Sequence, residues 1–470
     1  MAWNRVLCCF LLLLRASMAA PADLPDPAVG LFYETWFTPG VKSSILNPDW
    51  ATTEAQPILG FYSSHDAHVI EQHARWFAWL GIDFLGVDWT NNLFDQSNPW
   101  EHHSGNQREL TETTRLLLQT LTRVRHQGVA APRVTLLLGL ENGIAATVPR
   151  LNNEIQWVYD NYVKNPELNE SLAYLDGKPL LILFRGAGCA AVPGIQAAAF
   201  TIRWMSHQLQ TGKPRDCGMW SWMDGVAQPV VTRYKGRAEA VTVTPAFFPP
   251  IGPTTGWLDK NAMGRRNGAT YLTEWNVALK ARPRFLLINQ WNEFAGQKDG
   301  QGYGPKHDGY GDTYSIELSD DIEPTKLHGC GYRGCGGWGY YYMNLTRALM
   351  ALYRGETPDA TLVALSAPLE GSTIPPGPAH FGWTLAGAAA KSFTLRMDGR
   401  VIAQDYHGED YQIASGAAGA GSHTVTLTAN GTRSYFDLPN GALAVRRSKA
   451  LEATSTIHFS VRPHLNPEKR

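Results

Sequence analysis

The sequence alternates between short apolar segments and amphipathic segments, and this alternation constrains its fold more than any other feature. Seven apolar or β-branched runs predict strands, over residues 28–36, 83–89, 133–142, 179–186, 218–224, 240–248 and 284–293. Helical periodicity predicts helices over residues 68–80, 108–125, 154–163, 195–209, 269–281 and 340–353. Strands that alternate with helices are typical of a parallel sheet covered by helices. The sequence therefore predicts an α/β fold.

Two architectures fit this alternation, a closed (β/α)₈ TIM barrel and an open, doubly wound sheet. The barrel needs an eighth strand, which we place in the irregular region 297–335. A doubly wound sheet that binds dinucleotides carries a glycine-rich phosphate loop after its first strand, and no such loop follows residues 28–36. We therefore favour the TIM barrel.

The character of the sequence changes after Gly355. Five prolines between residues 358 and 378 indicate a linker, and strand-like runs follow at 392–397, 423–427, 443–445 and 456–461. Short strands separated by Gly, Ala and Ser turns are typical of a small β-sandwich. We predict a signal peptide over residues 1–20, a catalytic barrel over 21–356 and a C-terminal β-sandwich over 357–470.

The N-terminal segment has the layout of a secretory signal peptide. One arginine precedes an unbroken apolar run over residues 6–14, and small residues follow up to residue 20. The apolar run is too short to span a bilayer. We expect a secreted protein, extracellular or periplasmic, with no membrane association after cleavage; an uncleaved signal anchor is the alternative.

Cysteines and sequons bear on the same compartment. Four cysteines remain after signal cleavage: Cys189, Cys217, Cys330 and Cys335. An even number in an oxidising compartment indicates two disulfides, and the short loop favours 330–335, which leaves 189–217. A zinc site is the rival, but paired C-x-x-C knuckles are absent. Three sequons would carry glycans in a eukaryotic secretory pathway, least of all the one in an aromatic helical segment at residue 344: Asn169, Asn344 and Asn430.

The charge balance and the aromatic content indicate the class of ligand. The chain has 41 basic and 42 acidic residues, a formal net charge of -1, so it lacks the basic surface that nucleic-acid binding requires. Its 16 Trp and 18 Tyr residues are an excess of rings, which fill cores but also line sites for flat, weakly charged ligands such as sugars. A glycan is therefore the expected partner, while the oligomeric state stays open.

Acidic and aromatic residues recur where the predicted strands end. In a TIM barrel these ends share the face that carries the active site. The candidate catalytic acids are Asp88, Glu141, Asp224 and Glu293. The candidate substrate-binding residues at the same ends are Tyr33, Glu34, Trp36, Trp89, Arg185, Trp220, Trp222, Trp291 and Asn292. Several acids on one face are hard to explain by packing alone, because each buried charge needs a partner.

Paired carboxyl groups between aromatic walls are what glycoside hydrolysis requires. One acid protonates the leaving oxygen, while a carboxylate attacks or stabilises the anomeric centre or activates water. Sequence spacing gives no carboxyl–carboxyl distance, so retention and inversion both stay open. We expect no cofactor and no metal; acidic residues at 308, 312, 320 and 321 lack the spacing of an EF-hand calcium loop.

Two segments carry a resemblance to a known family. P-I-L-G-F-Y-S-S-H-D at residues 57–66 and W-N-E-F at residues 291–294 resemble glycoside hydrolase family 99 and its WbsX-like relatives, over about residues 28–350. The resemblance implies a (β/α)₈ barrel. It also implies retaining hydrolysis of α-linked, mannose-type glycosides within larger glycans, without a metal.

The sequence departs from the pattern of this family at one catalytic position. Glu293 matches the first glutamate of the family motif, but Gly296 stands where the second is expected. Glu323, in I-E-P at residues 322–324, resembles the glutamate of a later L-E-P and joins the substrate-binding candidates. We expect Glu293 to be the general acid/base, and its partner acid is open among Asp88, Glu141, Asp224 and Asp312.

Two other classes of function remain as alternatives. The first is a non-catalytic glycan-binding protein on a degenerate barrel, because the same fold hosts many functions. The second is a secreted, metal-dependent polysaccharide hydrolase or lyase. A serine hydrolase and a thiol redox enzyme are disfavoured, because the sequence has neither a G-x-S-x-G elbow nor a C-x-x-C pair.

Overall fold

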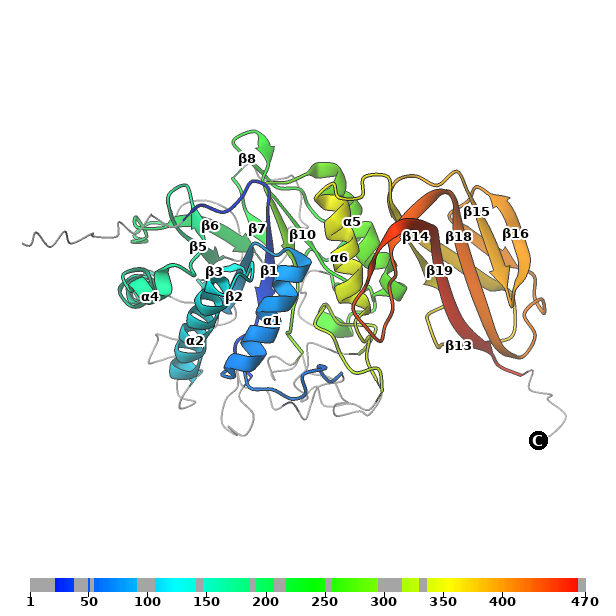
Figure 1. Ribbon diagram of the computed structural model, residues 1–470, viewed down its shortest axis with the longest axis horizontal. Coiled ribbons are helices and arrows are strands. Elements are labelled where there is room, and N and C mark those ends of the chain that lie inside the picture. Colours follow the sequence, from blue (N-terminus) through cyan, green and yellow to red (C-terminus); the bar gives the residue numbers. More distant parts are fainter. Residues whose placement is uncertain are drawn as a thin grey trace, which may run out of the picture.

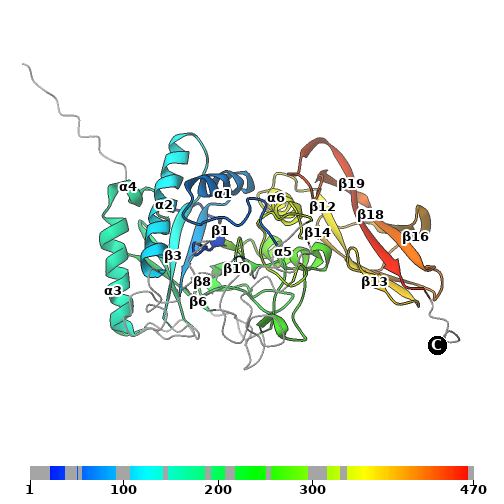
Figure 2. The same ribbon diagram turned by 90° about the horizontal axis from the view of Figure 1, so that it is seen from below.

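The computed structural model describes residues 22–37, 50, 55–90, 106–140, 147–185, 192–206, 217–249, 256–294, 315–328 and 336–463. These residues form a barrel of parallel strands surrounded by helices and, beside it, a smaller β-sandwich (Figure 1). Helices α5 (Ala269–Ala281) and α6 (Tyr341–Tyr353) lie between the barrel strands and the sandwich (Figure 2). Within these ranges, none of the helices combines the length and the apolar character that a membrane span requires.

Eight parallel strands form the barrel wall. In hydrogen-bonded order they are β10 (Ala240–Val243), β11 (Phe285–Ile288), β1 (Ala28–Tyr33), β2 (Phe84–Trp89), β3 (Arg133–Gly139), β5 (Lys178–Phe184), β6 (Thr201–Ser206) and β7 (Trp220–Ser221). Side chains join β7 to β10, since Thr242 Oγ1 donates to the carbonyl of Ser221 at 2.7 Å and Ser221 Oγ donates to Thr242 Oγ1 at 3.0 Å. This nearly closed barrel confirms the predicted (β/α)₈ TIM fold.

Strand β6 corrects two predictions. It occupies residues for which the sequence predicted a helix over 195–209, and it is the eighth strand that we expected in region 297–335. Both predictions are wrong for one reason: a short apolar run looks the same in a buried strand and in a buried helix. Parallel pairing of residues 201–205 with residues 180–184 of β5 decides for the strand.

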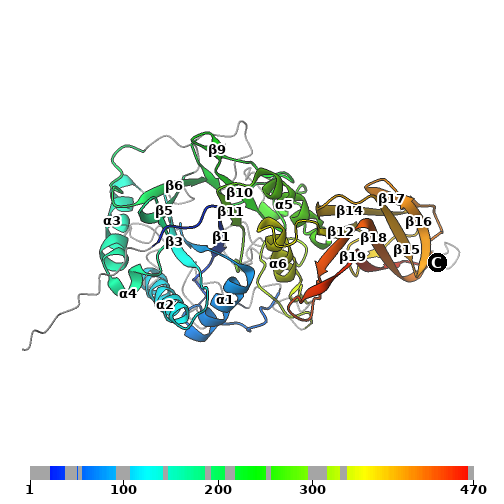
Figure 3. The ribbon, with the colours of Figure 1, turned by 45° about the horizontal axis from the view of Figure 1, so that its top comes forward.

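Helices cover the outside of the barrel. Along one side lie α1 (Ala67–Leu80), α2 (Asn106–His126), α3 (Val148–Val158) and α4 (Pro166–Asn169) (Figure 3). Local signals set the bounds of α1: Asp66 Oδ1 accepts the His68 N–H at 2.8 Å, and Gly81 ends the helix with a φ of 84°. The structure confirms the predicted helices at 68–80, 108–125, 269–281 and 340–353. The prediction over 154–163 covers the end of α3 and a π-helical turn, Tyr159–Val163.

Aromatic rings fill the interior of the barrel. Phe32 and Phe84 point inward from neighbouring strands, and each lies against a glycine of the other strand. A Cβ on Gly86 would approach the Phe32 ring to 2.7 Å, and a Cβ on Gly30 would clash with the Phe84 ring. Phe32 also stacks on Trp222, with ring centroids 4.5 Å apart. Because the interior is packed, a ligand site has to lie at one end of the barrel.

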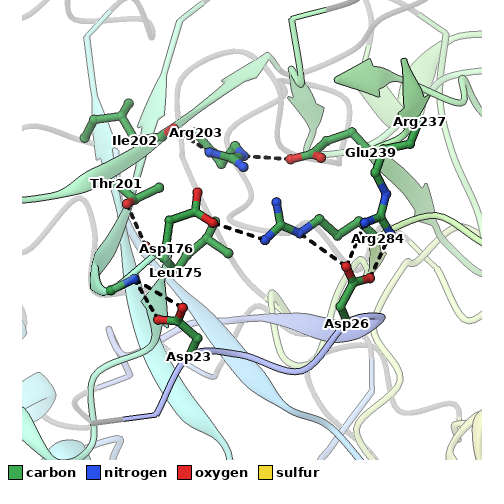
Figure 4. A network of polar contacts seen from close by, with 11 residues as sticks. Asp23, Asp26, Leu175, Asp176, Thr201, Ile202, Arg203, Arg237, Glu239 and Arg284 are labelled. Atoms are coloured by element: carbon green, nitrogen blue, oxygen red, sulfur yellow. Dashed lines mark hydrogen bonds and ion pairs between the residues drawn. The ribbon is translucent and has the colours of Figure 1, made fainter. Parts of the chain in front are cut away.

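Ion pairs lie at the N-terminal end of the barrel (Figure 4). The buried guanidinium of Arg203 on β6 donates to Glu239 Oε1 at 2.7 Å. Closer to solvent, Arg237 donates to both carboxylate oxygens of Asp26, at 2.7 and 2.8 Å, and Arg284 lies within 3.9 Å of the same carboxylate. Side chains at this end of a TIM barrel serve stability, whereas active sites lie at the C-terminal end.

Two sheets form the C-terminal β-sandwich and confirm its prediction. One contains β12 (Thr361–Ala367), β14 (Ala379–Gly387) and β17 (Asp410–Ile413). The other contains β13 (Thr373–Ile374), β19 (Arg446–Val461), β18 (Gly421–Phe436), β15 (Ser392–Met397) and β16 (Arg400–Tyr406). The proline-rich segment therefore holds strands, and residues 443–445 form no strand, both contrary to prediction.

Short elements complete the described parts of the chain. Strand β4 (Tyr174–Leu175) pairs antiparallel with β5, and β8 (Arg233–Tyr234) forms a hairpin with β9 (Arg237–Ala238). Two 3₁₀ turns, Gly256–Leu258 and Arg266–Gly268, precede α5.

Asn344 on α6 fastens the sandwich to the barrel. It is fully buried, and its Nδ2 donates to the carbonyls of Pro439 and Ala442 at 2.7 and 2.8 Å. Its Oδ1 accepts the N–H of Ala444 at 2.6 Å. This sequon residue therefore uses its whole amide inside the interface, where a glycan has no room.

Candidate active site

Asn292 fixes the chain at the point where β1 ends. Its Oδ1 accepts the N–H of Glu34 at 2.8 Å, and its Nδ2 donates to the carbonyl of Glu34 at 3.1 Å. Phe32 lies in the barrel interior, and alternate residues of a strand face the same side, so Glu34 faces inward above it. Asn292 thus holds the backbone of an inward-facing carboxylate.

Gln290 brings Glu34 and Glu293 together. Its Nε2 donates to Glu34 Oε1 at 2.8 Å and to Glu293 Oε2 at 3.1 Å. The sum of these two distances is an upper limit on the separation of the two oxygens, and it is smaller than the roughly 6.5 Å at which inverting pairs begin. Two carboxyl groups whose nearer oxygens share one amide donor are compatible with the separation of about 5 to 5.5 Å in retaining glycosidases.

The two glutamates differ in burial. Glu34 is fully buried, whereas Glu293 is only half-buried. Glu293 is therefore the member of the pair that a ligand can reach first. Phe294 directly follows it and stacks in parallel with Trp338, with ring centroids 6.0 Å apart.

Asp88 is a third acid on the same face. The register pairs Tyr33 with Val87, so Glu34, directly after β1, follows beside Asp88 of β2. Burial raises the pKa of Asp88 to about 6, although the Thr90 N–H, 2.6 Å from Oδ1, acts to lower it. A carboxyl group with such a pKa exchanges protons readily near neutral pH.

Asp224 lies at the end of β7 and belongs to a second acidic pair. Its Oδ2 accepts the N–H of Val230 at 2.8 Å. Its partner, Glu274 on α5, accepts the N–H of Thr244 at 2.6 Å where β10 ends. Burial raises the pKa of Glu274 well above its usual range, and the charge of Asp224 raises it further. Glu274 was missed because an acid on the buried face of a helix gives no signal in the sequence.

Glu323 lies behind the site and contacts no open surface. It is fully buried, with His73 Nε2 3.1 Å from Oε1 and the hydroxyl of Tyr62 donating to Oε2 at 2.8 Å. The Tyr62 hydroxyl also accepts from Asn292 Nδ2 at 3.0 Å. Glu323 therefore supports Asn292 and is not placed to bind substrate.

Several predicted sugar platforms are core residues. Tyr33 faces outward and its hydroxyl lies 3.1 Å from His73 Nδ1, while Trp89 donates from Nε1 to Thr114 Oγ1 of α2 at 3.1 Å. Trp291 is fully buried against α1, and Trp220 is fully buried inside the barrel. None of these four rings can stack on a sugar in this fold.

Other predicted residues are less completely buried. Trp222 and Trp36 retain 7% and 6% exposure, which is little but not zero. Arg185 follows β5 and is half-buried, with its guanidinium 5.8 Å from the centre of the Trp204 ring.

Some predictions fall on residues outside the described ranges. Glu141 and Asp312 are among them, as are Cys189, Cys330 and Cys335. Cys217 is disulfide-bonded, and its pairing with Cys189 stays a prediction. Within the described ranges, no group of three or more His, Cys, Asp or Glu side chains is placed to hold a metal ion.

Comparisons with known proteins give weak similarity. No protein-family model matches the sequence, and no curated protein matches it. The solved GH99 endo-α-mannosidase from Bacteroides thetaiotaomicron in complex with BIS-TRIS-propane is 17% identical, with a TM-score of 0.45, over 70% of this chain and 98% of that chain. A glycoside hydrolase-like protein is 12% identical, with a TM-score of 0.42, over 72% and 97% of the two chains. Such likenesses carry no argument, and the fold rests on the strand order.

Proposed function

We propose that this chain is a secreted glycoside hydrolase that cleaves glycosidic bonds in a glycan or polysaccharide. The carboxyl pair of Glu34 and Glu293, held by one amide at the C-terminal end of a TIM barrel, carries the proposal. Glycoside hydrolysis needs two such groups beside the bond that breaks. Residues 1–20 act as the signal peptide in this proposal.

The difference in burial assigns the roles. In the first step Glu293 gives its proton to the glycosidic oxygen, that C–O bond breaks, and the Glu34 carboxylate forms an ester with the anomeric carbon. In the second step Glu293 takes a proton from water, whose oxygen replaces Glu34 at the same carbon. The net reaction adds one water and retains the anomeric configuration. Because Glu34 is fully buried, its carboxylate has to become accessible to the anomeric carbon when a sugar enters the site.

The class of sugar is a further part of the proposal. The resemblance of residues 57–66 and 291–294 to family 99 favours an α-mannoside-type substrate. Trp222 and Trp36 keep a small exposed fraction, 7% and 6%, and are the aromatic candidates for sugar contact in this proposal. A first screen should therefore include α-mannans and mannose-rich glycans.

A glycan panel with proton NMR of the first-formed anomer tests this proposal. We expect cleavage with retention, and Glu293→Gln and Glu34→Gln should each lower kcat by roughly 10³-fold or more. Glu409→Gln, an exposed acid in the sandwich, is the matched control and should leave kcat unchanged. Inversion, or full activity in either active-site variant, would remove the proposed mechanism.

A non-catalytic glycan-binding role is the second candidate, and Gly296 favours it because the family motif has its second glutamate there. In that case calorimetry would show glycan binding by the wild-type protein, while no bond would be cleaved.

Activity that disappears with a chelator and returns with calcium or zinc would instead favour the metal-dependent alternative.

A further inference from the structure

Gln290 has no unused polar atom. It is fully buried, its N–H donates to the carbonyl of Asp320 at 3.0 Å, and its carbonyl accepts the N–H of Ile322 at 2.9 Å. In its side chain, Oε1 accepts the N–H of Trp291 at 3.2 Å, and Nε2 faces Glu34 and Glu293. The contact with Trp291 determines the orientation of the amide, because a flipped amide would place its oxygen against two carboxyl groups.

The chemistry of an amide suits a pair of acids that must hold different charges. An NH₂ group has two hydrogens, so each carboxyl group receives one of them. Unlike an arginine or a lysine, the amide is neutral, and it does not favour the doubly ionised pair through a charge of its own. It can therefore fix the separation of the pair while one member is protonated and the other ionised.

We propose that Gln290 is a positioning residue that sets the separation and the protonation of the Glu34–Glu293 pair. The inference rests on the proposed function, because that function gives the pair its reaction. The residue donates a hydrogen bond to each of the two glutamates and acts through them. The segment 320–322 serves as its support, since both backbone hydrogen bonds of Gln290 end there.

Gln290→Met is the decisive variant, because methionine has a similar length and no hydrogen-bond donor. Misplacement of a catalytic group by about 1 Å can cost on the order of 10²-fold, so kcat should fall by about that factor with KM little changed. Gln290→Asn keeps the amide on a shorter side chain that cannot reach both acids. Its kcat should lie between those of the wild type and Gln290→Met. Asn289→Ser is the matched control, because Asn289 is also a buried amide and its Nδ2 donates to Asp320 Oδ2 at 3.1 Å.

A second measurement is independent of turnover. Carbon NMR of protein labelled at the glutamate carboxyl carbons follows both acids, with signals assigned from Glu34→Gln and Glu293→Gln. Loss of a donated hydrogen bond disfavours the ionised form, so in Gln290→Met both carbons should titrate at higher pH than in wild type.

The two measurements separate the two ideas. If both carbons titrate in Gln290→Met as they do in wild type, the positioning role is wrong, whether or not the protein cleaves glycosides. If both shift but no glycan is cleaved by the wild-type protein, Gln290 does organise the pair and the proposed hydrolase is wrong. Equal losses of kcat in Asn289→Ser and Gln290→Met would also overturn the inference, because they would reveal a merely structural effect.

Discussion

Substitutions of Arg203 and Glu239 test whether their ion pair at the N-terminal end of the barrel is buried from solvent. Their side chains are 6% and 0% exposed, and the guanidinium lies 5.0 Å from the centre of the Tyr234 ring. Removal of one partner leaves the other charge buried without compensation, which costs about 3 to 5 kcal/mol. We therefore expect Arg203→Met and Glu239→Leu each to lower the free energy of unfolding by that amount.

The double variant Arg203→Met/Glu239→Leu should recover most of this loss. An apolar pair of similar volume replaces a buried ion pair at little net cost, so the double variant should lie within about 2 kcal/mol of wild type. Urea unfolding followed by tryptophan fluorescence measures all three variants. Arg237→Met is the matched control, because it breaks the ion pair with Asp26. The side chains of Arg237 and Asp26 are 52% and 44% exposed, so this variant should lower the free energy of unfolding by at most about 1 kcal/mol. Single variants that cost no more than this control would refute the burial of the pair.

Three further predictions concern Asp88, Gly339 and Asn344. The pKa of Asp88 is raised from 3.8 to about 6, so between these pH values the folded state holds a proton that the unfolded state loses. This proton adds about 3 kcal/mol to the free energy of unfolding below pH 4, and the stabilisation is lost as the pH rises to about 6. Asp88→Asn should therefore weaken the fall in Tm over this window, and an unchanged pH profile would contradict the raised pKa. Gly339→Ala should cost about 2 kcal/mol or more in thermal unfolding, since Gly339 has a φ of 58° and an added Cβ would clash with the carbonyl of Asn440; wild-type stability would refute that close approach. In eukaryotic expression Asn344→Gln should leave the glycan mass unchanged, and mass spectrometry that finds a glycan on Asn344 would disprove the interface.

The barrel could be predicted from the sequence because its evidence is local. Apolar runs and amphipathic helices recur along the chain, and each can be recognised without its neighbours. The strand at 201–206 could not be recognised from its local sequence, because only its pairing with β5 distinguishes it from a buried helix. The short β7 and β10 were located correctly but predicted too long.

The carboxyl pair of Glu34 and Glu293 could not be predicted from local sequence patterns, because it depends on which strands pair in the barrel. Glu34 and Glu293 are far apart in the sequence and meet because β1 pairs with β11 when the barrel closes. The alternation of side chains was a signal that sequence reasoning did not use. With Phe32 inward, Glu34 must face the interior and Tyr33 must face the helices, and the same rule separates Asp88 from Trp89. Applied to each strand, it would have selected the acids and rejected most of the rings.

The C-terminal sandwich contacts the barrel at a glycine-rich segment, residues 336–339. Gly339 accepts the N–H of Thr325 through its carbonyl at 3.1 Å, and the following N–H, of Tyr340, donates to the carbonyl of Asn440 in the sandwich at 2.7 Å. Trp338 donates from Nε1 to the carbonyl of Glu323 at 2.8 Å.

This segment passes between two backbones at such close range that side chains would not fit. An added Cβ on Gly337 would clash with the side chain of Thr325, and one on Gly339 would clash with the backbone of the sandwich. Glu323 in turn donates its N–H to the carbonyl of Trp291, next to Gln290 and Asn292. Hydrogen bonds and the short chain segments between them therefore connect the sandwich to the residues that hold Glu34 and Glu293. We therefore expect the sandwich to stabilise the barrel's C-terminal face.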